Sequence, residues 1–289
     1  MANIYKAPCK CYNQDKKGGG FMNSIISNIL ADKTGGRIFE LFGPWHFFYI
    51  ILAVATITIV LAAIQNKGYD VRKKVVRVFI FIAFGLYMAD FFLMPFAYGS
   101  IDTEKLPFHG CTSMCLMCFF SYYSKFLEKY RMSFVLLGLL SNITYLIYPA
   151  GVMWYAVHPL SYRVVQTMLF HCVMTIYTIL MLVIEYKSLD IKKCYRDFAV
   201  VGCLAVWALI GSYAYGEVLN GVHTGYNWFF VVRDPIGVIP TDISPYLMPF
   251  LNIIVFSAAE MLIHLLIFGI KKAKDSKKAV DNTPLTVIE

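Results

Sequence analysis

The chain has 289 residues, of which 58% are hydrophobic and only 15% charged, and its formal net charge is +8. Soluble domains have about 25% charged residues, so this composition excludes an ordinary soluble protein and favours a membrane protein. The excess of basic charge points to anionic lipid headgroups as partners, and no nucleic-acid partner is expected.

Seven apolar segments are long enough to cross a bilayer, whose hydrocarbon core takes about 20 helical residues to span. In chain order they are 46–64, 76–98, 107–124, 133–153, 164–185, 198–219 and 246–270. The earlier apolar stretch, Phe21–Ala31, is too short and is interpreted as a surface helix. We therefore predict an all-α polytopic fold with an N-terminal segment over 1–45, a seven-helix transmembrane bundle over 46–270 and a basic tail over 271–289.

Basic residues are distributed unevenly over the connections between these segments. The connections after the first, third, fifth and seventh segments carry 17 lysines and arginines, whereas the others carry only Lys105, Arg163 and Arg233. Because basic loops stay on the cytoplasmic side, we predict an N-terminus outside and a C-terminus inside the cell membrane. The basic loops would then contact anionic headgroups at the cytoplasmic face.

Ionisable and other polar residues gather at the predicted outer ends of at least five segments, where each needs a physical reason. They are, in chain order, His46, Asp90, His109, Cys111, Gln166, His171 and Glu217, and the loop after the sixth segment adds His223, Tyr226 and Asn227. A single buried His or Asp often acts only as a hydrogen-bonding strut between helices, worth about 1 kcal/mol or less. The convergence of so many instead predicts a polar pocket open to the outer leaflet. Glu260 and His264, four residues apart in the inner half of the seventh segment, are expected to pair with each other.

The eight cysteines do not suggest a disulfide framework, because five of them lie inside predicted spans. Among these, Cys111 has the most reactive predicted position. Pro107 is a natural first helical residue, which places Cys111 in about the first turn, where the helix dipole favours a thiolate although burial opposes it. His109 would point to a different helix face, so His171 fits better as its base. Cys115 and Cys118 lie deeper and are expected to be packing residues.

The stretch Leu106-Pro107-Phe108-His109-Gly110-Cys111 resembles the L-P-x-H-x-C signature of YwaF-type bacterial integral membrane proteins. His46, the Leu169–His171 step and the stretch Gly225–Phe230 are similar to further features of that family, and the resemblance covers about 40–270. It implies a multispanning fold. Through distant eukaryotic relatives that transfer polyunsaturated acyl chains onto ether phospholipids, it also implies an acyl-accepting cysteine at Cys111 and a histidine partner at His171. Those relatives place a histidine directly after the cysteine, whereas Thr112 follows here.

These observations predict a cysteine-dependent acyltransferase or thioesterase that acts on membrane lipid in the outer half of the bilayer. Cys111 would form a thioester and His171 would be the general base. Asp90 or Glu217 would orient a histidine, with His109 in the same catalytic group. The residues predicted to bind substrate are His46, Glu217, Tyr226 and Asn227, and Asn227 could also donate to an oxyanion. No cofactor or metal is expected under this hypothesis.

Two alternatives remain open. In a small-solute or proton-coupled transporter the same groups would coordinate the solute or proton, although the chain shows no internal repeat of the kind many transporters have. In a metal-dependent membrane hydrolase the three histidines His46, His109 and His171 would supply an N/O ligand set together with Asp90 and Glu217.

Overall fold

A computed structural model of the chain describes residues 37–98, 103–153, 157–219, 222–224, 226–235 and 237–281. The predicted surface helix at Phe21–Ala31 and the end of the basic tail lie outside these ranges. For Glu217 and His223 the structure describes the backbone but not the side chain.

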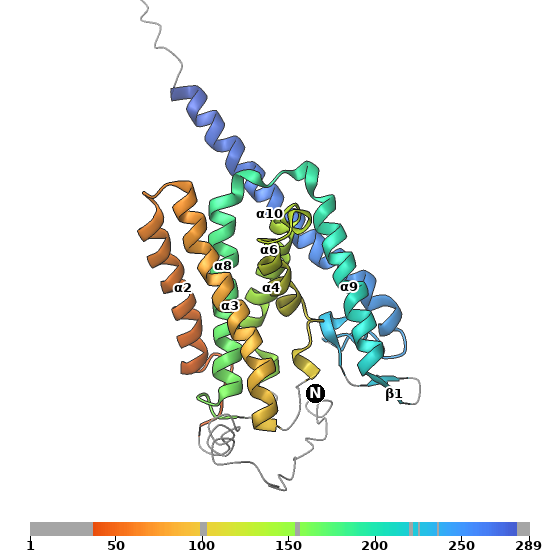
Figure 1. Cartoon of the computed structure of the whole chain (residues 1–289). Coiled ribbons are helices and arrows are strands. Elements are labelled where there is room, and N and C mark those ends of the chain that lie inside the picture. The colour runs from red at the N-terminus through yellow and green to blue at the C-terminus, as the bar shows by residue number, and fades with distance from the viewer. Residues whose placement is uncertain are drawn as a thin grey trace, which may run out of the picture.

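The described chain is a bundle of helices (Figure 1), which confirms the predicted all-α class. Its longer helices are α2 (Pro44–Ile64), α3 (Tyr69–Tyr98), α4 (Gly110–Phe120), α6 (Arg131–Ile147), α8 (Tyr162–Glu185), α9 (Tyr195–Tyr215) and α10 (Ser244–Asp281). The short ones are η1 (Thr103–Lys105), α5 (Lys125–Glu128), α7 (Ala150–Met153), η2 (Tyr186–Ser188), η3 (Ile191–Lys193) and η4 (Trp228–Phe230). The one exception to the helical class among the described residues is a hairpin of two three-residue strands, β1 (Glu217–Leu219) and β2 (Val222–Thr224), in which Val218 faces His223 across the pair.

Six helical stretches are long and apolar enough to cross a membrane, which supports a multi-pass protein in contact with lipid. They are Pro44–Ile64, Tyr69–Leu93, Arg131–Met153, Tyr162–Ser188, Ile191–Tyr215 and Ser244–Ala273. The predicted third span, 107–124, differs from the rest. It is helical only over the 11 residues of α4, which rise about 16 Å and so cross only about half of a bilayer core.

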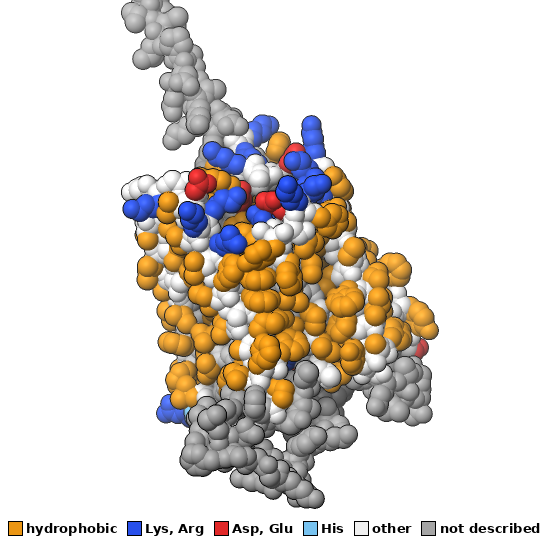
Figure 2. Space-filling view, in the orientation of Figure 1, with side chains coloured by type: hydrophobic (Ala, Val, Ile, Leu, Met, Phe, Trp, Pro, Cys, Tyr) orange, Lys and Arg blue, Asp and Glu red, His pale blue; other side chains and the backbone are white. Residues whose placement is uncertain are grey.

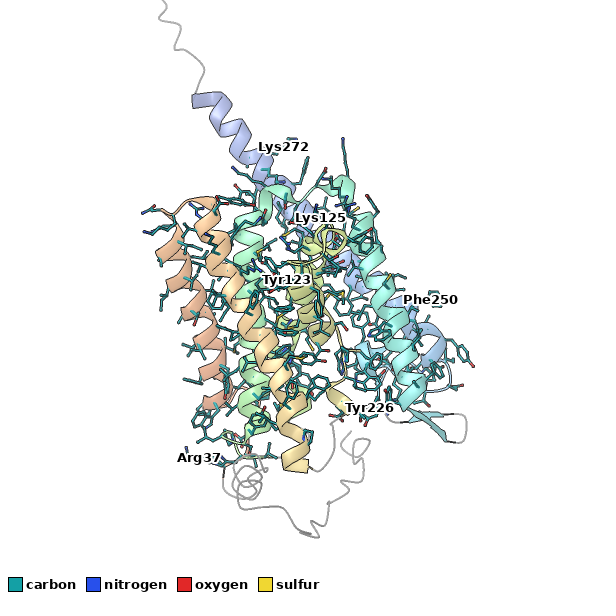
Figure 3. All side chains as sticks on the ribbon, viewed as in Figure 1. Arg37, Tyr123, Lys125, Tyr226, Phe250 and Lys272 are labelled. Carbon is teal, nitrogen blue, oxygen red and sulfur yellow. The ribbon has the colours of Figure 1, made fainter. Side chains whose placement is uncertain are left out.

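The two ends of the bundle differ in charge. Figure 3 places Lys125 and Lys272 at one end and Arg37 and Tyr226 at the other, and Figure 2 shows lysine and arginine side chains gathered around the first of these ends. We call it the basic end. The uneven basic charge predicted from the sequence is therefore present in space, while its assignment to the cytoplasmic side remains a prediction.

The helix α4 begins inside the bundle because tertiary contacts hold the residues before it in a non-helical conformation. The Phe108 ring lies against Gly211 of α9, and its centroid is 4.8 Å from those of both Trp207 and Trp228. The Pro107 carbonyl accepts hydrogen bonds from Trp207 Nε1 (2.7 Å) and Ser113 Oγ (2.6 Å). Because the Pro107 carbonyl accepts these two hydrogen bonds, it does not accept a helical one, and α4 starts only at Gly110.

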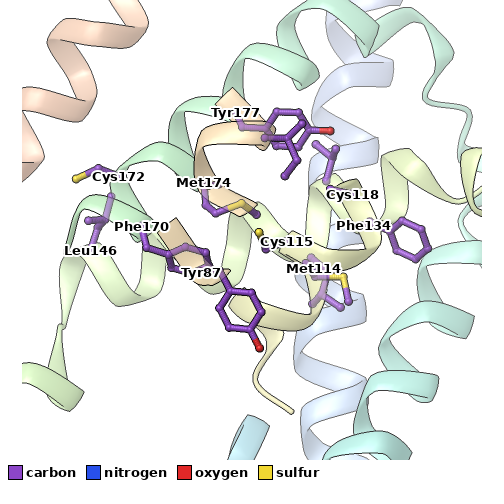
Figure 4. Close-up of a cluster of buried hydrophobic side chains, with 14 of the residues drawn as sticks. Tyr87, Met114, Cys115, Cys118, Phe134, Leu146, Phe170, Cys172, Met174 and Tyr177 are labelled. Carbon is purple, nitrogen blue, oxygen red and sulfur yellow. The ribbon is translucent and has the colours of Figure 1, made fainter. Parts of the chain in front are cut away.

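The core lies where α8 packs against α2, α3 and α6, and α4 fits between α3 and α6. Figure 4 shows part of this core, in which Cys115 lies beside Met114 and Met174, and Cys118 lies near Tyr177. Both cysteines are fully buried in the apolar cluster. They are packing residues, as predicted.

Candidate functional site at the start of α4

Cys111 is the second residue of α4 and a free thiol that is only partly buried. The first intrahelical hydrogen bond runs from Ser113 N–H to the His109 carbonyl (2.9 Å), so the N–H groups before Ser113 have no helical acceptor. Those of Cys111 and Thr112 lie close enough to Cys111 Sγ to interact with it. The positive end of the helix dipole adds to this local preference for negative charge. The start of α4 therefore has local features that stabilise negative charge on the thiol, whereas its burial in the apolar bundle, the larger effect, opposes a thiolate.

His171 of α8 is oriented by Asn142 of α6. The Asn142 side chain donates from Nδ2 to the Gly138 carbonyl (2.6 Å), which turns its Oδ1 toward His171 Nδ1 at 2.8 Å. Because Oδ1 can only accept, the hydrogen-bond network assigns the proton to His171 Nδ1 and leaves a lone pair on Nε2. The Tyr145 ring stacks on the imidazole, with centroids 3.7 Å apart. A histidine held in one tautomer by a third group is the usual arrangement of a general base.

The same helix, α6, brings Cys111 and His171 to a similar depth. A Cβ atom on Gly110 would lie 2.5 Å from Ser141 Oγ, so the first residue of α4 touches the neighbour of Asn142. Between these two described residues, Cys111 and His171, the structure shows no hydrogen bond. Asn142 is 11 residues from Arg131 at the basic end, about 16 Å along α6. The site thus lies near the middle of the bundle, deeper than the predicted outer position, because α4 starts at Gly110 and has only 11 residues.

Lys105 completes this group and was missed as a site residue in the sequence, where it counted only as a loop charge. Its Nζ lies 3.3 Å from Asp90 Oδ2 and 3.2 Å from Thr167 Oγ1. Tyr162 also donates a hydrogen bond to Asp90, which is only 2% exposed. Lys105 is close enough to Cys111, His109 and His171 to interact with them electrostatically. The sequence did contain a signal for this pair. Asp90 is an acid inside a predicted span, and Lys105 is one of only three basic residues on the connections at the predicted outer side.

His109 connects the start of α4 to the loop that follows β2. It is the N-cap residue of α4, and its Nδ1 accepts a hydrogen bond from the Phe229 N–H at 3.4 Å. Phe229 and Phe230 have φ angles of 51° and 53°, an uncommon region for bulky residues. Asn252 of α10 stabilises this conformation, since it donates to both of their carbonyls at 2.9 Å.

The residues predicted to bind substrate have other contacts. Asn227 closes its own loop, because Oδ1 accepts from the N–H groups of Val232 and Arg233 and Nδ2 donates to the Arg233 carbonyl. The Tyr226 ring stacks on Trp228 and its hydroxyl contacts Thr103.

His46 is fully buried and uses both ring nitrogens. Its Nδ1 accepts from the Phe42 N–H (2.9 Å) and its Nε2 donates to the Leu146 carbonyl (2.6 Å), so it joins α2 to α6. His46 and Asp90 thus have separate partners and do not gather with His109 and His171 as one ligand set. Within the described parts of the chain, no group of three or more His, Cys, Asp or Glu side chains could hold a metal ion.

Comparison with known proteins places this chain in one family. The model of the TMEM164 family matches residues 41–270, almost the same range as the predicted resemblance, although the match carries no YwaF name and no bacterial origin. No curated protein and no solved structure matches the chain. Because the matched range is well over half of the 289 residues and the bundle has six apolar helices of membrane-spanning length, the chain belongs to the TMEM164 family of transmembrane proteins.

Proposed function

We propose that this protein is a membrane-embedded, cysteine-dependent acyltransferase or thioesterase that acts on lipid, with Cys111 as nucleophile and His171 as general base. The observation that carries the proposal is the position of Cys111, at the free N-terminus of a half-length helix. It lies at the depth of an imidazole whose tautomer is fixed by Asn142. Nucleophile, base and orienting group are the three parts that covalent acyl transfer needs.

In the first half of the reaction, His171 Nε2 would take the thiol proton of Cys111. The thiolate would attack the acyl carbonyl carbon, forming the S–C bond while the carbonyl electron pair moves to oxygen. Collapse of this intermediate would break the bond to the leaving alcohol, which receives the proton from His171. The product of this half is an acyl thioester on Cys111 and a free alcohol.

In the second half, the hydroxyl of an acceptor lipid or a water molecule would attack the thioester after His171 removes its proton. The acyl group leaves with the new oxygen, and Cys111 recovers its proton from His171. The choice between a lipid hydroxyl and water is the difference between a transferase and a thioesterase. The N–H groups of Cys111 and Thr112 are suited to stabilise the oxyanion in both halves, and the positive charge of Lys105 acts in the same direction.

The separation of Cys111 and His171 is compatible with this chemistry, because catalytic hydrogen bonds are often long in the absence of substrate and tighten in the reactive complex. Asp90 and His109 have positioning roles in this proposal. Asp90 holds Lys105 near the thiol, and His109 holds the loop before α4 against η4.

An electrophile carried on an acyl chain tests the proposal. The purified protein in lipid vesicles should be labelled, and Cys111→Ser should abolish labelling. His171→Ala should slow it about 10²–10⁴-fold, the usual contribution of a general base. Cys203→Ser, which removes an exposed thiol from α9, is the matched control and should label like the wild type. Equal labelling of Cys111→Ser and wild type would contradict the proposal.

One observation favours a transporter as the second candidate. The helix α4 starts in the middle of the bundle, and transporters use such half-helix N-termini to bind anions. A wild-type protein that takes no label but releases a trapped anion from vesicles would support this candidate over the enzyme.

A further inference from the structure

A second group of ionisable side chains lies between α9 and α10, nearer to the basic end than Cys111. It consists of Asp197, Glu260 and His264, all of them buried. Leu204, which reaches Gly110 at the start of α4, is seven residues or about 10 Å further along α9 than Asp197. This group is therefore separate from the candidate acyl-transfer site.

The pairing within this group differs from the prediction. His264 Nε2 lies 2.6 Å from Asp197 Oδ2, so His264 pairs across the helix interface and not with Glu260 on its own helix. The difference arises because α9 begins at Tyr195, which places Asp197 inside the helix and on the face toward α10. Glu260 is left with 0% exposure, and neither of its carboxyl oxygens has a hydrogen-bond partner among the described residues.

No described basic side chain neutralises Glu260. The elements packed against α10 are α9, α6, η3 and η4, and their charged groups near this end are bound or exposed. Arg131 of α6 donates to Ser121 and pairs with Glu128. Arg196 of α9 donates to the Lys129 carbonyl. Lys271 of α10 donates to the carbonyls of Lys187 and Leu189. Lys192 and Lys193 of η3 are exposed, and η4 has no titratable side chain. The described titratable group that acts on Glu260 is Asp197, which is itself an acid.

An ionised carboxylate in this position would be buried without a partner among the described residues, which is far more costly than holding it as a neutral acid. A single proton on Glu260 removes this unpaired charge, and a neutral side chain is the less costly state in a low-dielectric interior.

A proton also fits this site better than a metal ion. A metal ion needs several ligand atoms, and the described side chains offer no group of three or more that could hold one. A proton needs only one of the two unpartnered oxygens of Glu260. Buried ionisable residues inside a membrane commonly mark proton or ion pathways.

We propose that Glu260, together with the Asp197–His264 pair, is a proton-binding site in the half of the bundle toward the basic end. In its loaded state the proton lies on a Glu260 oxygen. On release, this O–H bond breaks, the proton passes to water at the basic end, and Glu260 becomes a carboxylate.

Infrared spectroscopy of the reconstituted full-length protein tests the site directly. The wild type should show the C=O band of a protonated carboxyl group at neutral pH, and this band should disappear as the pH rises. Glu260→Gln should remove the band. Glu128→Gln is the matched control, because it changes an acid at the same end whose side chain is 59% exposed, and it should leave the band intact.

Unfolding supplies a second measurement that does not depend on any activity. Because the native state keeps a proton that the unfolded chain loses, the unfolding equilibrium constant of the wild type should rise with pH, by up to tenfold per pH unit. Glu260→Gln keeps the size and neutral charge of the loaded side chain and should lack this dependence. A wild type with no protonated carboxyl band at neutral pH, or a Glu260→Gln variant with unchanged pH dependence of unfolding, would overturn the proposal.

Discussion

Gly211 offers a sharp test of how α9 positions the candidate nucleophile. A Cβ atom at Gly211 would lie 2.5 Å from two atoms of the Phe108 ring, whereas ordinary contacts are 3.4–4 Å. Gly211→Ala must therefore displace the ring, and with it the Pro107–His109 segment that precedes Cys111, by about 1 Å. Overpacking of this kind destabilises by about 1–3 kcal/mol. A misplacement of about 1 Å at a reacting group can slow a reaction about 10²-fold.

Gly202→Ala is the matched control on the same helix, because a Cβ at Gly202 has no atom within 4 Å. It should leave labelling of Cys111 unchanged and stabilise the helix slightly, by about 0.5–1 kcal/mol. The assay is the rate of labelling by the acyl-chain electrophile together with the thermal unfolding temperature of each variant.

A smaller side chain at Phe108 should relieve the clash, so Phe108→Leu combined with Gly211→Ala should recover part of the lost labelling rate. If Gly211→Ala labels as fast as Gly202→Ala, the contact between Phe108 and Gly211 does not position Cys111.

Three further predictions use the same protein. Asn142→Ala should slow labelling by about 2- to 13-fold, because it removes one neutral hydrogen bond worth about 0.5–1.5 kcal/mol that holds the tautomer of the catalytic imidazole; an unchanged rate would remove Asn142 from the mechanism. Lys105→Met should destabilise by about 3–5 kcal/mol because it removes the lysine that pairs with the buried Asp90 carboxylate, and Asp90→Asn in the same chain should recover much of that loss in thermal unfolding. Single cysteines near Arg72 and Lys192, in a background without native cysteines, should resist an impermeant thiol reagent in intact cells. Rapid labelling at both positions would reverse the predicted orientation.

The sequence by itself determined the membrane class, six helices of membrane-spanning length among the seven predicted and the gathering of basic charge at one end. These properties depend on local composition, because any apolar run of sufficient length forms a helix in a bilayer that leaves no other way to satisfy the backbone. The burial of Cys115 and Cys118 followed from the same helical spacing.

The tertiary structure alone decided where α4 begins, because its start depends on contacts of Pro107 and Phe108 with Trp207 and Gly211, about 100 residues further along the chain. It also decided which partners the buried polar groups have. Asp90 pairs with Lys105, and His264 pairs with Asp197. A local pattern shows that a residue is buried and polar, but its partner is set by which helices pack together and at what depth. That is why the sequence could name Cys111 and His171 but could not show that Asn142 orients the imidazole or that Glu260 has no partner among the described residues.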